Sequence, residues 1–309
     1  MVRLYLTIKL EGFGLKKCDA KMKIVWISSI SCNGNSHSFL NDENLFVIFE
    51  NFEFLYHPLL EGKYSLSKLK FVEDFDILII EGALRDNFKR GDIDIKELFL
   101  TLSKRASFII CVGNCASFGG IFKEADNTIS GVLFNKEEKS YLYEMLCKKS
   151  INLPGCPIHP SWLFYTLFMI KDSKKILLDS YLRPKEIYAY LSHDGCVRNE
   201  YFEWKVDSEN FGLKEGCLYY KQGCQGPYTH SSCNKILWNS VNSKTRAGMP
   251  CIGCTEPAFL KREVFETKTN MSIPEHTPLG VSKRAYLTFT GIAKSLKNER
   301  LSKRLIDED

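Results

Sequence analysis

The sequence lacks the features that would place it among membrane, exported or nucleic-acid-binding proteins. No stretch of its 309 residues approaches the roughly 20 consecutive apolar residues of a transmembrane helix. The N-terminal segment alternates polar and apolar side chains as a strand does, with neither a long apolar run nor a twin-arginine pair. The formal net charge of +5 is too small over this length to predict an extended nucleic-acid-binding face.

The composition also excludes a disordered or fibrous chain, because 44% of the residues are hydrophobic and 26% are charged. Cysteine is the exception, with 12 residues. A disulfide framework needs an oxidising compartment, and no export signal is evident. We therefore expect a cytoplasmic protein whose cysteines stay reduced and serve as metal ligands or buried thiols.

The chain divides into two regions of different character. The first contains short, continuously apolar runs that are typical of parallel strands covered on both faces, at 24–27, 77–80 and 108–112. Between the last two, apolar residues recur at the spacing of one helix face: Ile95, Leu98, Phe99 and Leu102. The pattern predicts a doubly wound α/β domain over 23–184, preceded by an extension over 1–22, and its ligands should lie beyond the carboxyl ends of the strands.

The second region, 185–309, is rich in Cys, Gly, Asn and Pro and shows no long apolar periodicity. It has too little periodic apolar surface to hold itself together, so we expect bound metal or cofactor to supply cross-links. Its last part, from Ile292 to Leu305, is predicted to form an amphipathic helix.

Three cysteines follow apolar strands of the first region, each close to a glycine: Cys32, Cys115 and Cys156. Glycine lets the backbone turn sharply and direct its N–H groups toward a bound anionic group. Because the carboxyl ends of parallel strands meet at one edge of a sheet, the three thiols are expected to converge.

The second region carries two pairs of metal-ligand spacing and three further cysteines: His193-x2-Cys196, Cys217, Cys224, Cys233 and Cys251-x2-Cys254. Residues separated by two positions reach one metal or cluster from a tight turn. The set exceeds one tetrahedral zinc site and lacks the regular pairing of two. Iron–sulfur clusters are favoured, and a zinc-stabilised interaction module is the alternative.

Further residues accompany these cysteines in order along the chain: Trp26-x5-Cys32, Glu81-Gly82, Val112-Gly113-x-Cys115-x3-Gly119-Gly120, Pro154-Gly155-Cys156-Pro157, Gly216-Cys217, Gly223-Cys224, Thr229-x3-Cys233 and Cys254-x-Glu256-Pro257. The series resembles the small, electron-transferring subunit of nickel-iron hydrogenases over nearly the whole chain. The resemblance implies a flavodoxin-like domain that holds a proximal cluster, then a loop-rich domain that holds medial and distal clusters. It also implies a large-subunit partner that carries the nickel-iron site.

By this resemblance the proximal cluster falls on Cys32, Cys115, Cys156 and the residue three after Cys32, which is Asn35 where most of the family has cysteine. A three-iron cluster, a ligand from Asn35, and a replacement from Ser36 or His37 are all open, so the proximal centre is 3Fe–4S or 4Fe–4S. The asparagine resembles the cytoplasmic uptake hydrogenases of cyanobacterial type.

The distal 4Fe–4S cluster falls, by the same resemblance, on His193, Cys196, Cys217 and Cys224. The medial 3Fe–4S cluster falls on Cys233, Cys251 and Cys254, with Lys244 at the position that can supply a further ligand. The remaining cysteines match no ligand position and are expected to be thiols without metal: Cys18, Cys111 and Cys147.

The implied function is that of an electron wire from hydrogen oxidation at the large subunit to an acceptor, which could be ferredoxin-like, quinone-linked or other. A hydrogen-sensing regulatory complex built from similar subunits is an alternative. No residue of this chain is predicted to be catalytic. Candidates for the large-subunit interface are aromatic residues next to the proximal motifs, for which a place in the core is the alternative: Phe39, Phe118 and Trp162.

Overall fold

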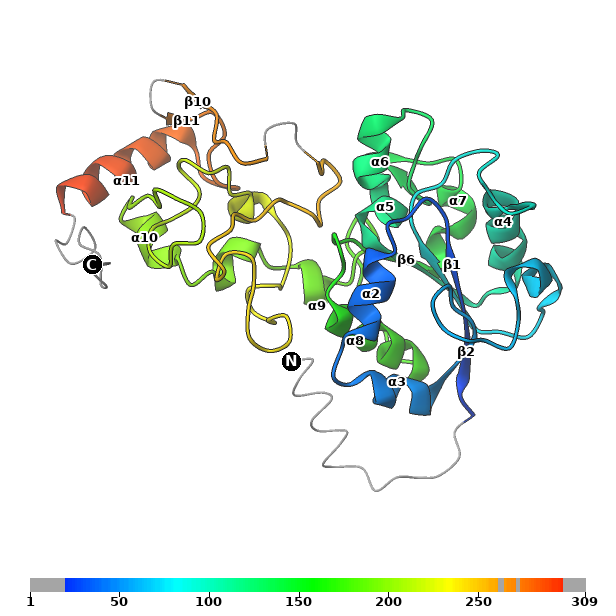
Figure 1. Cartoon of the computed structure of the whole chain (residues 1–309). Helices are drawn as coiled ribbons and strands as arrows, with labels where there is room; N and C mark the ends of the chain where they lie inside the picture. The colour runs from blue at the N-terminus through cyan, green and yellow to red at the C-terminus, as the bar shows by residue number, and fades with distance from the viewer. Residues whose placement is uncertain (1–19, 261–263, 271–272, 297–309) are drawn as a thin grey trace. The chain divides into compact units, whose positions relative to one another are not determined.

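The computed structural model describes residues 20–260, 264–270 and 273–296, and most of the expected extension lies outside these ranges. The chain divides into two compact units between Ile187 and Tyr188 (Figure 1). The boundary expected from the sequence, after residue 184, lies slightly earlier. Among the described residues, no helix is both long and apolar enough to cross a membrane.

The first unit is built on five parallel strands. They are β1 (Met22–Ser28), β2 (Phe52–Tyr56), β3 (Ile77–Glu81), β6 (Phe108–Val112) and β9 (Ser150–Leu153). The spatial order β2-β1-β3-β6-β9 is the flavodoxin-like order, with its topological switch point between β1 and β3. The predicted doubly wound α/β fold is confirmed.

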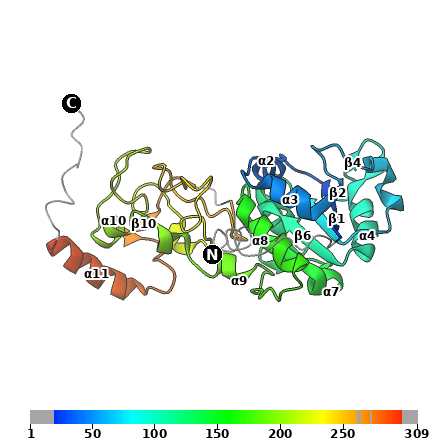
Figure 2. The same cartoon turned by 90° about the horizontal axis from the view of Figure 1, so that it is seen from below.

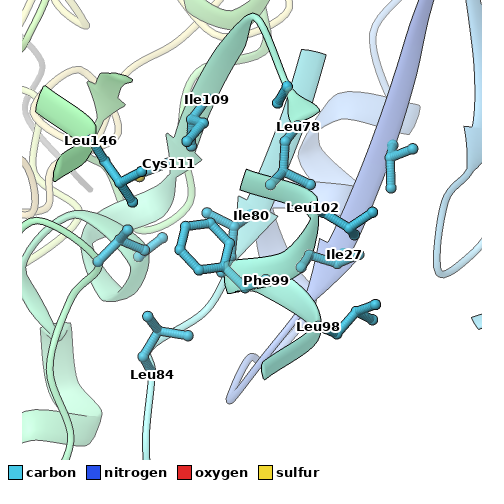
Figure 3. Close-up of a cluster of buried hydrophobic side chains, with 14 of the residues drawn as sticks. Ile27, Leu78, Ile80, Leu84, Leu98, Phe99, Leu102, Ile109, Cys111 and Leu146 are labelled. Atoms are coloured by element: carbon cyan, nitrogen blue, oxygen red, sulfur yellow. The ribbon is translucent and has the colours of Figure 1, made fainter. Parts of the chain in front are cut away.

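Alternation along the strands supplies a core on each face of this sheet. Ile27, Leu78 and Cys111 lie in the core cluster on the side of α4 (Ile95–Arg105), the helix predicted from the sequence, whose buried residues include Phe99 (Figure 3). On the other face, Trp26 packs against Phe39 of α2 (Gly34–Leu40), and α8 (Pro160–Lys171) covers the same side (Figure 1). Continuous burial on both faces explains the unbroken apolar runs.

The three aromatic residues expected at the subunit interface are core residues instead. Phe39 and Phe118 are fully buried, and Trp162 is 2% exposed. The structure therefore decides for the core alternative at these three side chains, because proximity to a cluster motif in sequence says nothing about which way a ring points.

The remaining elements of the first unit are short. They are α3 (Leu45–Asn51), α5 (Gly113–Phe118), α6 (Gly120–Ala125), α7 (Tyr143–Leu146), α9 (Lys185–Tyr188), η1 (Leu66–Phe71), η2 (Cys147–Lys149), β4 (Lys89–Arg90), β5 (Ile93–Asp94), β7 (Phe134–Asn135) and β8 (Glu138–Lys139).

The second unit consists mainly of loops (Figure 2). Its elements are η3 (Ser192–Gly195), α10 (Asn199–Glu203), η4 (Gly226–Tyr228), β10 (Thr269–Asn270), β11 (Ile273–Pro274) and α11 (Lys283–Ser295). The helix α11 begins earlier than the predicted terminal helix, at Lys283, and ends at Ser295, where the prediction continued to Leu305. The predicted residues 297–305 lie outside the described residues. One buried cluster of this unit contains three cysteines and two neighbours: Cys217, Leu218, Tyr219, Cys224 and Cys251.

Candidate metal centres

The three cysteines of the first unit follow β1, β6 and β9 at the carboxyl ends of the strands. Burial raises the pKa of Cys115 to about 12, and the nearby Cys156 and Cys32 add to the shift, so both of these thiols lie within electrostatic reach of Cys115. A thiol with a pKa as high as that of Cys115 needs a cationic centre to bind it before it loses its proton. The convergence expected from the sequence is therefore present in the structure.

Glycines leave room beside these thiols. Gly120 has a φ of +55°, and a Cβ added there would lie 2.6 Å from Sγ of Cys115. A Cβ at Gly34 would lie 3.2 Å from Sγ of Cys32. A larger residue at either position would crowd the sulfur that the site needs, and at Gly120 it would also force a left-handed backbone.

Asn35 is buried beside this site and connects three strand ends. Its Nδ2 donates to Oε1 of Glu81 at 3.2 Å and makes a longer contact of 3.5 Å with the carbonyl oxygen of Val112. Its Oδ1 accepts a hydrogen bond from the backbone N–H of Ile158 at 2.9 Å. Both ends of the amide are engaged, so Asn35 ties β3, β6 and the loop after β9 together.

Glu81 organises the same corner from the end of β3. Its side chain is fully buried and also accepts hydrogen bonds from the backbone N–H of Asn35, at 3.0 Å, and from the hydroxyl of Ser36. His37, the third candidate for the open ligand position, is exposed. In the sequence, Glu81 stands out only as part of the Glu81-Gly82 motif. A carboxylate at the end of an otherwise apolar strand is the signal that could have indicated its structural role.

Two of the remaining cysteines lie away from the thiol group. Cys111 belongs to the core cluster on the α4 face of the sheet, with Leu102 and Leu146, and burial raises its pKa (Figure 3). Cys147 precedes β9, whereas Cys156 follows it, so Cys147 lies at the opposite end of that strand. Cys18 lies outside the described residues.

The distal set of the second unit surrounds one cavity. Its lining includes all four predicted ligands: His193, Cys196, Cys217 and Cys224. A backbone N–H points at each of the three sulfurs, from Arg198 to Cys196 at 3.4 Å, from Tyr219 to Cys217 at 3.4 Å, and from Cys251 to Cys224 at 3.3 Å. Hydrogen bonds of this kind favour thiolates and tune iron–sulfur clusters, so the donor set fits such a cluster.

His193 lies between this cavity and a wider groove of about 550 Å³, which is also lined by Trp204 and Phe289. Its ring packs edge-on against Phe202, with centroids 4.4 Å apart. Burial lowers the pKa of His193, which favours the neutral imidazole that ligates metals. His193 is thus the one predicted distal ligand that lines both spaces.

The medial set adjoins the distal set. Burial and the neighbouring Cys233 raise the pKa of Cys251, which shows that these two thiols are close. Hydroxyl groups accompany them, with Oγ of Ser192 3.6 Å from Sγ of Cys233, and Oγ1 of Thr229 3.6 Å from Sγ of Cys251. Cys254 follows Cys251 across a turn in which Gly253 has a φ of +75°.

The side chain of Lys244 is exposed, so solvent screens its charge from the medial cysteines. Among the described residues, no three His, Cys, Asp or Glu side chains are placed to hold a single metal ion.

Two comparisons with known proteins identify the family. Residues 188–266 match the profile of the C-terminal region of NiFe/NiFeSe hydrogenase small subunits, and residues 32–170 match that of the NADH ubiquinone oxidoreductase 20 Kd subunit. The chain is 33% identical over 287 residues to the F420 non-reducing hydrogenase I small subunit of Methanosarcina mazei, an alignment that covers 78% of this chain and 74% of the relative. The chain belongs to the nickel-iron hydrogenase small-subunit family.

This hydrogenase small subunit is also similar to the periplasmic [NiFe] hydrogenase small subunit of Solidesulfovibrio fructosivorans, with 34% identity over 211 residues, 66% of this chain and 62% of the relative. Its fold matches the [NiFeSe] hydrogenase of Desulfovibrio vulgaris Hildenborough, with a TM-score of 0.68 and 24% identity over 82% of this chain and 100% of the other. It likewise matches the actinobacterial-type NiFe-hydrogenase of Ralstonia eutropha H16, with a TM-score of 0.67 and 23% identity over 96% and 95% of the two chains.

Family membership confirms the hydrogenase prediction. As a hydrogenase small subunit, the chain carries iron–sulfur clusters and pairs with a large subunit. The zinc-module alternative concerned residues 185–309, and the family profile matches 188–266 within that region. Membership of this family therefore favours iron–sulfur clusters over a zinc module.

Proposed function

We propose that this small subunit holds three iron–sulfur clusters and relays electrons from hydrogen, oxidised on the large subunit, through proximal, medial and distal positions to an acceptor. The supporting observation is the contact between the second unit's two ligand sets. Cys251, a medial ligand, donates its backbone N–H to the sulfur of Cys224, a distal ligand. One residue thus contacts both sites, which makes the route between them short.

The cluster types follow from the number of thiols at each site. Three cysteines in the medial set favour a 3Fe–4S centre, and three cysteines with His193 favour a distal 4Fe–4S centre. The proximal site also has three cysteines, while Asn35 and Ser36 are hydrogen-bonded to Glu81. These bonds favour a proximal 3Fe–4S centre, or a 4Fe–4S centre whose fourth ligand is not a thiolate.

We also propose that the chain belongs to the cytoplasmic uptake hydrogenases of cyanobacterial type. Asn35 and the block from Thr229 to Cys251 support this assignment by their resemblance to that group. The acceptor would then be a ferredoxin-like, quinone-linked or other electron carrier that docks close to the distal cluster.

Anaerobic purification of this chain together with its large subunit tests the cluster proposal. We expect a brown heterodimer with about ten or eleven cluster iron atoms in the small subunit, one further iron in the nickel-iron site of the large subunit, about twelve acid-labile sulfides and little zinc. Zinc as the main metal, or iron sufficient for one cluster only, would contradict the three-cluster relay.

Asn35→Cys tests the proximal cluster type separately. A thiolate adds negative charge and favours the oxidised form, so a fourth cysteine should create a four-thiolate 4Fe–4S centre with a lower reduction potential than the wild-type centre. Magnetic resonance and potentiometry of both proteins measure this change. A wild-type proximal centre that already has four thiolate ligands would show that another cysteine ligates it.

A further inference from the structure

Arg198 is a buried cation without a carboxylate partner. It is 2% exposed and lies two residues after the distal ligand Cys196. Its guanidinium donates to backbone carbonyl oxygens only: those of Thr245 at 2.7 Å, Glu215 at 3.0 Å, Gly216 at 2.6 Å, and Leu213. In the described part of the chain, no Asp or Glu side chain forms an ion pair with it. Buried charges in proteins are usually paired, so this one needs a counter-charge.

The distal cysteines, once they bind a cluster as thiolates, can supply that charge. Arg198 lines the same cavity as Cys196, Cys217 and Cys224. Burial lowers the pKa of Arg198, whereas the three cysteine charges raise it. Because arginine stays protonated under any physiological condition, it offers this cavity a permanent positive charge.

The net charge of the proposed cluster is the reason that a cation in the same cavity matters. A four-iron core with three thiolates and a neutral imidazole carries a net negative charge, and reduction by one electron adds another. Adding negative charge to a buried site is unfavourable, and a fixed cation in the same cavity offsets part of that cost.

We propose that Arg198 is the fixed counter-charge of the distal cluster and raises its reduction potential, so that the electron is held at the acceptor end of the relay. The backbone carbonyls hold the guanidinium in place, so the charge needs no carboxylate that would cancel it. This inference rests on the proposed three-cluster function and adds a residue that sets the potential of its last step.

Lys205, a second cation of the same unit, provides a comparison for the charge of Arg198. Its Nζ lies 4.4 Å from the ring centroid of Phe202 and 5.0 Å from that of Tyr286, and it donates to the carbonyl oxygen of Phe202 at 3.1 Å. It lines the open groove rather than the cluster cavity and is only half-buried. Solvent therefore screens its charge more than that of Arg198.

The test is a potentiometric titration of the distal cluster, followed by magnetic resonance, in the heterodimer and its variants. Arg198→Gln should lower the distal midpoint potential, and Arg198→Lys, which keeps the charge, should retain most of the wild-type value. Lys205→Gln should give a smaller shift than Arg198→Gln. Arg183→Gln removes another buried cation, one paired with Asp179 at 2.7 Å in the other unit, and should give no shift.

An unchanged potential in a fully loaded Arg198→Gln heterodimer would overturn the inference. If that variant fails to assemble the distal cluster, Arg198→Lys decides: a loaded cluster with the wild-type potential supports a role for the charge. A lysine variant that loses the cluster, or whose potential falls well below the wild-type value, shows that the guanidinium hydrogen bonds matter instead. A wild-type heterodimer without a distal four-iron signal would refute the proposed function itself, which separates the two failures.

Discussion

In the first unit the thiols are attached to a sheet whose core is complete without them, whereas in the second unit the thiols are part of the core. The strands β1, β3 and β6 are buried on both faces by aliphatic and aromatic side chains. The buried cluster of the second unit includes the candidate ligands Cys217, Cys224 and Cys251. From this comparison we expect the first unit to position its candidate ligands before a cluster binds, and the second unit to need bound iron–sulfur in order to fold.

Withholding iron should have the largest effect, and it should affect the second unit much more than the first. In the full-length chain produced without iron, the amides of residues 190–256 should exchange with solvent almost as fast as in an unfolded chain, because buried, protonated thiols do not replace iron–sulfur cross-links. The amides of β1, β3 and β6 should stay protected. Hydrogen–deuterium exchange with mass spectrometry measures both regions in one sample. Equal loss of protection in the two units would contradict the comparison.

His193→Ala tests the role of the second unit in the protein that has its clusters bound. Removing the ligand that lines the open groove should slow electron delivery to an external acceptor by about tenfold or more. Hydrogen–deuterium exchange catalysed at the large subunit needs no long-range transfer and should be nearly unchanged. The two activities are measured on the same intact heterodimer, and His230→Ala serves as the matched control because His230 pairs with Glu256 outside the distal cavity. A parallel loss of both activities would contradict the distal role of His193.

Asn35→Asp should weaken the first unit alone. The new carboxylate would replace the Nδ2 donor that faces Glu81, which places two acidic groups in contact in a buried corner. We expect the free energy of unfolding of this unit to fall by about 3 kcal/mol in denaturant titrations. The surface control Asn127→Asp makes the same chemical change at an exposed site and should stay within about 0.5 kcal/mol of the wild type. Equal stability of the two variants would show that the Asn35 bonds do not hold this corner together.

The features that could be predicted from the sequence are those that depend on the spacing of neighbouring residues. The apolar runs gave the strands of the sheet, the spacing of Ile95 to Leu102 gave α4, and glycines beside Cys32 and Cys115 marked the ligand loops. The hydrogen bonds of Asn35 join it to Glu81 and Ile158, 46 and 123 residues away. Such partners depend on how the strands are ordered in space, which no local spacing encodes.

The burial of Arg198 could not be predicted from the sequence for the same reason. Its closeness to Cys196 in sequence is visible, but its burial and its four carbonyl partners come from loops at 213–216 and 245. A charged residue in a glycine-rich segment is ordinarily solvated, so nothing in the sequence pattern indicates that this side chain is buried. In the second unit, where irregular backbone replaces a sheet, burial follows no periodicity that can be read in advance.

The smallest effects are expected for the cysteines that are not predicted ligands. They test whether the core side of β6 is separated from the side that holds the candidate ligands. Cys111 and Cys115 are four residues apart, yet Cys111 packs in the α4-side core while Cys115 lies with Cys32 and Cys156. Cys111→Ala should therefore lower the free energy of unfolding by about 1 kcal/mol, for the lost apolar contact, and leave the iron content unchanged. Cys147→Ser, at the far end of β9, should change neither quantity beyond about 0.5 kcal/mol. Cys115→Ala is the positive control and should remove the proximal centre. Loss of iron in Cys111→Ala would mean that this thiol reaches the cluster side, and the two faces of β6 would then not be separated as the structure has them.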